Sequence, residues 1–311
     1  MNQSAKRREP RAAGVYAAVL TPFEDDGMPS LELLVAHCRL LLAAGAHGLS
    51  VLGTTGEANS LTVAERMRIL EGLIDAGLDP AALLPGTGCC ALDDTVTLTQ
   101  GALALGISRV LMLPPFYYKS VDDEGLFAAY STVVERVADT RLQLYLYNIP
   151  QLSGIALGVG LVARLQAAYG DVIAGVKDSS RSLESLLAYC RLENFTVLAG
   201  TERLLVEALA AGGSGCIAAL VNTHAADVRR LYELARGDAG RERTATLARA
   251  GDVLERAPFV ASLKEVVAEQ TGDARWRNVR PPLRLLHPDE RERCLSGLAA
   301  LAIDSSGAGV P

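Results

Sequence analysis

Three apolar stretches of this sequence end in side chains that could do chemistry. Lys177 closes the run VIAGVKD, and Tyr147 stands near the end of the run LQLYLYN. Thr54 and Thr55 directly follow the run HGLSVLG. Runs of this length and composition are typical of buried strands in a parallel sheet, and polar residues at the carboxyl ends of such strands line active sites in barrels. We therefore expect these side chains to face one site.

A lysine, a tyrosine and two threonines form a coherent chemical set. A lysine in an apolar pocket loses the solvation of its ammonium group, which favours the free amine. A free amine can attack a ketone and form a Schiff base. The iminium then accepts electrons when a neighbouring carbon is deprotonated or a carbon–carbon bond is cleaved, and a nearby tyrosine can carry the proton. Hydroxyls and N–H groups in a Gly-Thr-Thr-Gly turn can hold a carboxylate beside the ketone.

Each of these residues also has a purely structural explanation. A lysine at a strand end can be a surface residue whose aliphatic stem covers apolar neighbours. Tyr147 can be a core tyrosine with a satisfied hydroxyl. The segment GTTGE can be an ordinary turn between a strand and a helix, with Glu57 capping that helix. The occurrence of all three at corresponding ends of predicted strands favours the chemical interpretation.

Eight short apolar runs alternate with longer amphipathic segments. Two of those segments, residues 31–45 and 63–77, carry apolar residues at helical spacing and end in glycine. Alternating strands and helices favour an α/β fold, and eight such strands predict a (β/α)8 TIM barrel. A doubly wound sheet is the rival, but the first run is not followed by a G-x-G-x-x-G loop. The predicted strands are residues 14–20, 47–53, 82–87, 108–114, 142–148, 172–178, 195–200 and 213–220.

The helical pattern continues beyond the last predicted strand. We expect residues 14–235 to form the barrel and residues 236–303 to form a C-terminal helical extension packed on it. The basic, polar residues 1–13 are expected to be a flexible tail, and residues 304–311 a frayed end.

Composition excludes several classes of protein. The chain has 311 residues, of which 50% are hydrophobic and 21% charged, so it can bury a sizeable core. The net charge of −6 argues against a general nucleic-acid binder. The sequence contains no stretch of about 18 uninterrupted apolar residues, so no membrane span is predicted. The six cysteines form no C-x-x-C pair and follow no secretory signal, which indicates reduced thiols in a cytoplasmic protein.

Five segments, taken in order, carry a resemblance to a known family. The chain resembles the dihydrodipicolinate synthase/N-acetylneuraminate lyase family of pyruvate-dependent class I aldolases, from the segment LTPF (20–23) to the segment VRPPL (279–283). The resemblance implies a (β/α)8 barrel, assembled as a homotetramer that is a dimer of dimers, without metal or organic cofactor. The five segments are GTTGE (53–57), PPFYYK (114–119), YNIPQLSG (147–154), GVKDSS (175–180) and GGSGCIAA (212–219).

The resemblance also assigns roles to individual residues. It implies that Lys177 forms the Schiff base with pyruvate and that Tyr147 is the acid/base tyrosine. Thr54 and Thr55 match the threonines that bind the pyruvyl carboxylate and support the proton relay. Tyr118 matches a tyrosine that reaches into the neighbouring subunit's site and completes that relay. The substrate-binding set expected on these grounds comprises Gly53, Thr54, Thr55, Leu152, Gly200, Glu202 and Ile217.

Departures from the family pattern bear on the second substrate. Dihydrodipicolinate synthases carry an arginine for the aspartate semialdehyde carboxylate where this chain has Leu152, so this reaction is not expected to be the main one. Sialic acid lyases use a Gly-Tyr-Asp-Glu segment and a serine, where this chain has the segment GTER (200–203) and Ala219. We therefore expect the substrate to be a different 2-keto acid, such as a 2-keto-3-deoxy sugar acid. If aspartate semialdehyde is nevertheless a good substrate, Arg181 and Arg203 are the first candidates to bind its carboxylate, since both follow predicted strands at the active-site end.

Two other classes stay open at this stage. One is a non-catalytic, pyruvate-sensing or structural barrel, which the intact set of lysine, tyrosine and threonines disfavours. The other is a metal-dependent aldolase or hydrolase. The four histidines, at positions 37, 47, 224 and 287, are not paired at a metal-ligand spacing. His37 and His224 are better explained as helix-surface or core residues.

Overall fold

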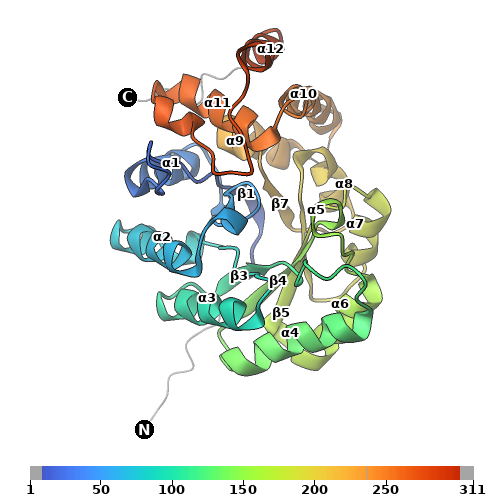
Figure 1. The fold of residues 1–311 in the computed structure, drawn as a ribbon. Coiled ribbons are helices and arrows are strands. Elements are labelled where there is room, and N and C mark those ends of the chain that lie inside the picture. The colour runs from blue at the N-terminus through green and yellow to red at the C-terminus, as the bar shows by residue number, and fades with distance from the viewer. Residues whose placement is uncertain (1–8, 236, 302–311) are drawn as a thin grey trace.

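The strands of this protein form a parallel barrel surrounded by helices (Figure 1). The structure, a computed structural model, describes residues 9–235 and 237–301. The hydrogen-bonded order is β2-β1-β7-β6-β5-β4-β3, and each paired strand is parallel to its neighbour. The strands are β1 (Gly14–Ala18), β2 (Gly48–Ser50), β3 (Arg109–Met112), β4 (Gln143–Asn148), β5 (Ile173–Asp178), β6 (Thr196–Ala199) and β7 (Gly215–Ala218).

The predicted strand at residues 82–87 is an irregular extended segment between β2 and β3. It makes single parallel bridges, from Leu83 to Leu49 of β2 and from Gly86 to Leu111 of β3. Pro85 lacks an N–H donor and therefore interrupts a regular ladder, although its carbonyl accepts the Leu111 N–H at 2.8 Å. The (β/α)8 prediction is confirmed, while the expectation of eight regular strands is wrong at this one position.

Helices alternate with the strands and then continue past β7. The predicted helices at residues 31–45 and 63–77 end where Gly45 and Gly77 adopt positive φ angles of 102° and 82°, which glycine tolerates without strain. The helices of the barrel are α1 (Leu31–Ala43), α2 (Val63–Asp75), α3 (Leu92–Ala104), α4 (Asp123–Val137), α5 (Pro150–Ser153), α6 (Val159–Tyr169), α7 (Leu183–Cys190), α8 (Leu205–Ala210) and α9 (Val221–Leu234).

The C-terminal part of the described chain is helical. It consists of α10 (Asp238–Leu254), α11 (Phe259–Thr271) and α12 (Pro288–Ala299). These helices contact one another, and α10 and α11 also contact α9 of the barrel. Short 3-10 helices occupy several connections: η1 (Ala58–Ser60), η2 (Pro80–Ala82), η3 (Gly170–Val172), η4 (Glu202–Leu204) and η5 (Ala274–Arg277).

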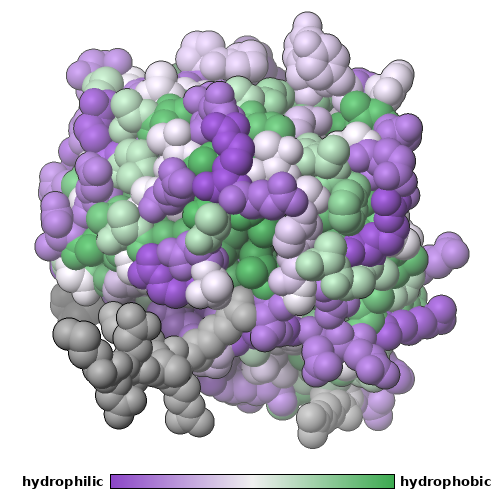
Figure 2. Space-filling model, turned by 90° about the horizontal axis from the view of Figure 1, so that it is seen from below, coloured by the Kyte–Doolittle hydropathy of each residue, from purple (hydrophilic) through white to green (hydrophobic). Residues whose placement is uncertain are grey.

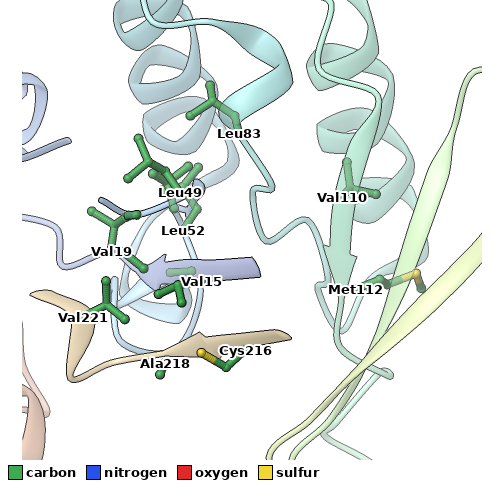
Figure 3. Packing of buried hydrophobic residues seen from close by; sticks show 14 of the residues in the cluster. Val15, Val19, Leu49, Leu52, Leu83, Val110, Met112, Cys216, Ala218 and Val221 are labelled. Carbon is green, nitrogen blue, oxygen red and sulfur yellow. The ribbon is translucent and has the colours of Figure 1, made fainter. Parts of the chain in front are cut away.

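Alternating side chains along the strands build two separate apolar layers. On β1, Val15 and Ala17 belong to the large cluster between strands and helices, whereas Tyr16 and Ala18 belong to a smaller one. The same alternation recurs on β3, β4, β6 and β7, as expected for strands whose successive side chains point to opposite faces. Figure 3 shows the outer layer, where residues of β1, β2 and β7 converge. The smaller cluster fills the barrel interior.

The N-terminal residues that the structure describes close one end of this interior. Ala12 is buried, and its N–H donates to the Tyr145 hydroxyl at 2.7 Å. The Glu9 carboxylate accepts from the Ser108 hydroxyl at 2.7 Å. Residues 1–8 and 304–311, the rest of the tail and the predicted frayed end, lie outside the described residues.

The molecular surface is mixed in character. Seen from below, one face carries hydrophobic patches between hydrophilic ones (Figure 2). Large hydrophobic side chains are exposed at several places, with Tyr117 and Tyr118 the most exposed among them. None of the helices in the described residues has the length and apolar character that a membrane crossing would require.

Candidate active site

A cavity of about 410 Å³ opens at the carboxyl ends of the barrel strands. The ends of β4, β5 and β7 contribute Tyr147, Lys177 and Ile217 to its walls, and the turn after β2 contributes Thr54 and Thr55. Cavities of this size accommodate small metabolites and drug-like molecules. The residues predicted at separate strand ends therefore share one cavity.

Lys177 and Tyr147 lie side by side within this cavity. They are in direct register on the neighbouring strands β5 and β4. The Lys177 Nζ donates to the Tyr147 hydroxyl at 3.2 Å and lies 4.3 Å from the centroid of its ring. Lys177 is only 4% exposed, so its amine is largely shielded from bulk water. The structural alternative of a surface lysine is wrong for this residue.

The Tyr147 hydroxyl is the centre of a small hydrogen-bonded group. Thr54 Oγ1 lies 3.4 Å from it, on the side of the turn after β2. Burial alone would raise the pKa of Tyr147, but the nearby Lys177 charge and hydrogen bonds from Thr54, Lys177 and Ser179 lower it overall. A general acid–base works best when its pKa lies near the operating pH, and the lowered pKa brings the Tyr147 hydroxyl closer to it. This hydroxyl can therefore exchange protons with a molecule bound at Lys177.

The turn that carries Thr54 and Thr55 is fixed from beneath. The Thr21 hydroxyl donates to the Gly56 carbonyl at 2.7 Å, and a Cβ at Gly56 would lie 2.8 Å from the Val19 carbonyl oxygen. Only glycine allows this close approach of two backbone segments. The turn is therefore held tightly against the end of β1.

Glu57 anchors the other end of the same turn. Its carboxylate is buried and accepts from the Lys264 ammonium of α11 at 2.5 Å and from the Arg280 N–H at 2.9 Å. Glu57 stands at the N-cap position of the short helix η1, as the alternative prediction has it, but its side chain makes no capping hydrogen bond there and does not cap α2. The capping box of α2 is formed instead by Thr62 and Glu65.

Most of the expected substrate-binding residues line the cavity. Leu152 of α5 is 62% exposed at its edge. Gly200, Glu202 of η4, Ile217 and Ala219 also face the cavity. Burial raises the pKa of the Glu202 carboxyl, although the Arg203 charge and hydrogen bonds partly oppose this. A carboxyl group of this kind can donate a hydrogen bond to a substrate oxygen when it is protonated.

Gly53 and Tyr118 lie elsewhere. Gly53 faces a small recess behind Thr54 and Tyr147 rather than the main cavity. Tyr118 is 74% exposed and is not among the residues around the cavity of its own chain. Its ring packs edge-to-face on Tyr117, with the centroids 5.3 Å apart.

Several residues that line the cavity were not predicted from the sequence. Ser179 follows Lys177 by two residues, and Gln151 donates to the Ser179 carbonyl at 2.6 Å. Part of the cavity wall comes from α10 and α11, which supply Leu254 and Phe259 among others. The position of Ser179 in the segment GVKDSS could have suggested its role, whereas the helical pattern of α10 and α11 does not reveal which face meets the barrel.

His37 and His224 are core residues in this fold. His37 is buried, and its Nε2 lies 3.1 Å from the Asn222 Oδ1. His224 is also buried, and its Nδ1 lies 2.8 Å from the Thr223 Oγ1. Within residues 9–235 and 237–301, no group of three or more His, Cys, Asp or Glu side chains is arranged to hold a metal ion.

The fold and the cavity define a TIM-barrel enzyme with its active site at the carboxyl ends of the strands. Comparison with known proteins narrows this class. The model of the dihydrodipicolinate synthetase family matches residues 11–301. The chain belongs to this family and is accordingly a lyase.

Individual relatives agree with this assignment. An uncharacterized DapA-like lyase of Chloroflexus aurantiacus is 38% identical over 231 residues, which cover 72% of this chain and 75% of the relative. The crystal structure of dihydrodipicolinate synthase from Agrobacterium tumefaciens is 31% identical, with a TM-score of 0.87, and covers 94% of this chain and 100% of its own. YagE, a prophage protein of the dihydrodipicolinic acid synthase family from E. coli K12, was solved in complex with pyruvate. It is 28% identical, with a TM-score of 0.86, and covers 93% of this chain and 98% of its own.

Proposed function

We propose that this protein is a Schiff-base-forming, pyruvate-dependent aldolase that acts on a 2-keto acid. The observation that carries the proposal is the buried Lys177 amine, which faces the cavity 3.2 Å from the Tyr147 hydroxyl. The Lys177 Nζ attacks the ketone carbon, and the carbonyl oxygen leaves as water. This gives an iminium joined to the protein.

The iminium makes carbon–carbon cleavage feasible. A proton leaves the hydroxyl of the substrate carbon beyond the bond, the bond breaks, and its electron pair moves into the iminium to give an enamine and an aldehyde. The Tyr147 hydroxyl is placed to take up and return protons, with Thr54 as the next group in the relay. The enamine is then protonated, and water releases pyruvate. The reverse sequence condenses pyruvate with an aldehyde.

The pyruvyl carboxylate is assigned to the turn after β2. Thr54 and Thr55 supply hydroxyl and backbone N–H donors at the cavity wall, where an anion beside the ketone would be held. The anchoring of this turn by Glu57 supports a fixed geometry for the bound keto acid. The pyruvate complex of YagE supports pyruvate as the ligand.

The second substrate is assigned to a 2-keto acid other than the lysine-pathway intermediate, such as a 2-keto-3-deoxy sugar acid. Leu152 stands at the cavity edge and offers no hydrogen-bond donor to the carboxylate of aspartate semialdehyde. The alternatives are 4-hydroxy-tetrahydrodipicolinate synthase and N-acetylneuraminate lyase. The relation to the Agrobacterium synthase keeps the first of these open.

A substrate panel tests this assignment. Purified protein is incubated with 2-keto-3-deoxy sugar acids, with N-acetylneuraminate, and with pyruvate plus aspartate semialdehyde, and pyruvate formation or loss is followed. We expect a 2-keto-3-deoxy acid to give the highest kcat/KM. Equal or better kcat/KM for aspartate semialdehyde would reverse the choice in favour of the synthase.

We further propose a homotetramer in which Tyr118 completes the proton relay of a neighbouring subunit. Tyr118 projects from its own chain and is 74% exposed, which supports a role at an interface. Light scattering should give a tetramer, and Tyr118→Phe should lower turnover. A fully active monomer, or unchanged turnover in Tyr118→Phe, would contradict the shared relay.

The six unpaired cysteines support location in a reducing compartment such as the cytoplasm.

A further inference from the structure

Arg181 is a second cation at the active-site cavity, beyond Lys177. It lies in the loop after β5, four residues past Lys177, and lines the same cavity. Its guanidinium makes a two-point ion pair with the Glu255 carboxylate, which follows α10 and also lines the cavity. The Nη2–Oε1 and Nη1–Oε2 distances are 2.7 and 3.2 Å. The pair thus links the barrel to the helical extension beside the cavity.

The backbone at Arg181 is in an unusual conformation. Its φ angle is +64°, in the left-handed region that side chains other than glycine rarely adopt. Such a conformation is energetically unfavourable, persists only when its surroundings enforce it, and is found mainly at functional sites. Here the Asp178 carboxylate accepts the Ser180 N–H at 3.0 Å, and the Ser180 hydroxyl accepts the Ser182 N–H at 3.2 Å. The loop holds the guanidinium at the cavity despite this cost.

The ion pair with Glu255 is easily exchanged. The Arg181 side chain is 64% exposed and that of Glu255 is 32% exposed. Ion pairs this accessible to water contribute little to stability. A carboxylate on a bound substrate could take the place of Glu255 and keep both guanidinium hydrogen bonds, since arginine binds carboxylates in a two-point geometry.

The other candidate cations do not compete for this role. Arg203 also binds α10, through the Asp252 carboxylate at 2.7 Å and the Ala248 carbonyl at 2.9 Å, but it does not line the cavity. Lys177 is committed to the Schiff base. Of the described residues around the cavity, Arg181 is the one guanidinium.

We propose that Arg181 determines substrate specificity by binding a second carboxylate, at the far end of the substrate from the keto acid. Glu255 holds the Arg181 guanidinium in this structure, and the substrate carboxylate displaces it on binding. The substrate class is then a 2-keto acid with a carboxylate at each end, which includes the dicarboxylic members of the 2-keto-3-deoxy sugar acids. This inference rests on the proposed Schiff-base function and refines its substrate.

Trapping with borohydride tests the inference without a known substrate. The protein is reduced with borohydride in rising concentrations of dicarboxylic 2-oxoglutarate or 2-oxoadipate, and of their neutral-tailed counterparts 2-oxopentanoate and 2-oxohexanoate. Mass spectrometry reports the adduct at Lys177, and its concentration dependence gives the half-saturating concentration. Pyruvate, which has no remote carboxylate, is trapped in parallel.

Three variants are compared with the wild type. Arg181→Gln should raise the half-saturating concentration of the better dicarboxylic acid on the order of 10- to 100-fold and spare its neutral counterpart. Glu255→Gln should lower it, because the competing carboxylate is gone. Arg203→Gln, which breaks the matched ion pair outside the cavity, should leave the ratio of the two acids unchanged.

The two cavity variants separate recognition from mere structural support. If the ion pair only tethers the barrel to the helical extension, Arg181→Gln and Glu255→Gln break it equally and shift the half-saturating concentration of the dicarboxylic acid in the same direction. That result would overturn the inference. So would trapping of pyruvate without any preference of the wild type for the dicarboxylic acids. Absence of a pyruvate adduct in the wild type would instead reject the Schiff-base function itself.

Discussion

Replacing Lys264 should destabilise the protein from within the helical extension. Lys264 and Glu57 form an ion pair whose side chains are both 0% exposed. Lys264→Met keeps an unbranched chain of similar length near the ring of Phe23, over which the ammonium now lies at 4.3 Å. The Glu57 carboxylate is then left buried without its cation. Breaking a buried pair in this way costs about 3–5 kcal/mol.

The contacts around Glu57 place the expected loss near the lower limit of this range. The carboxylate keeps one hydrogen bond, from the Arg280 N–H at 2.9 Å, and this bond limits the loss. The Asn278 carbonyl does lose the lysine donor at 2.6 Å, but it is an uncharged group and costs less to leave unpaired. We therefore expect Lys264→Met to lower the free energy of unfolding by about 3 kcal/mol. This is a large part of the roughly 5–15 kcal/mol that stabilises a typical domain.

Urea unfolding at pH 7 and fixed protein concentration measures this loss. The double variant Glu57→Gln/Lys264→Met removes both charges and should recover much of the stability, since a neutral pair is cheaper to bury than a lone charge. Arg293→Met is the control, because it breaks an exposed pair with Asp289 and should cost no more than about 1 kcal/mol. A loss in Lys264→Met no larger than in this control would refute the reasoning, as would a double variant no more stable than Lys264→Met.

Three further predictions follow from individual residues. Tyr147→Phe should lower kcat about 10²- to 10⁴-fold, as expected for loss of a general acid–base, while pyruvate is still trapped at Lys177; unchanged kcat would remove Tyr147 from the relay. Leu152→Arg should improve kcat/KM for aspartate semialdehyde by supplying a two-point carboxylate donor, and a lower value would contradict this. Burial lowers the pKa of His37 to about 4, so the unfolded chain binds its proton first on acidification, and stability falls as the pH drops from about 6.5 toward 4. Over that window, urea unfolding should show the wild type losing roughly 3 kcal/mol more than His37→Gln, and parallel losses would contradict this.

The barrel and the central pair of the site could be predicted because they depend on local patterns. Apolar runs mark the strands, and the residues at their carboxyl ends must meet where parallel strands close on themselves. Lys177 and Tyr147 occupy such ends and are in direct register in the structure. The strand predicted at residues 82–87 shows the limit of this reasoning, since apolar character alone does not reveal that Pro85 interrupts the ladder.

The supporting contacts could not be predicted because they join distant parts of the chain. Glu57 and Lys264 are 207 residues apart, and Arg181 and Glu255 are 74 apart. Helical periodicity indicates that α10 and α11 have an apolar face but not which element that face covers. The cavity wall formed by Leu254 and Phe259 therefore appears only when the helices are packed.

Reduction of the protein with borohydride in the presence of pyruvate tests the Schiff-base mechanism most directly. We predict one reduced three-carbon adduct, located at Lys177 by mass spectrometry of peptides. Lys177→Ala should remain folded by circular dichroism, lose the adduct and lose turnover. No adduct in the wild type, or an adduct at Lys119 or Lys264 in place of Lys177, would contradict the mechanism.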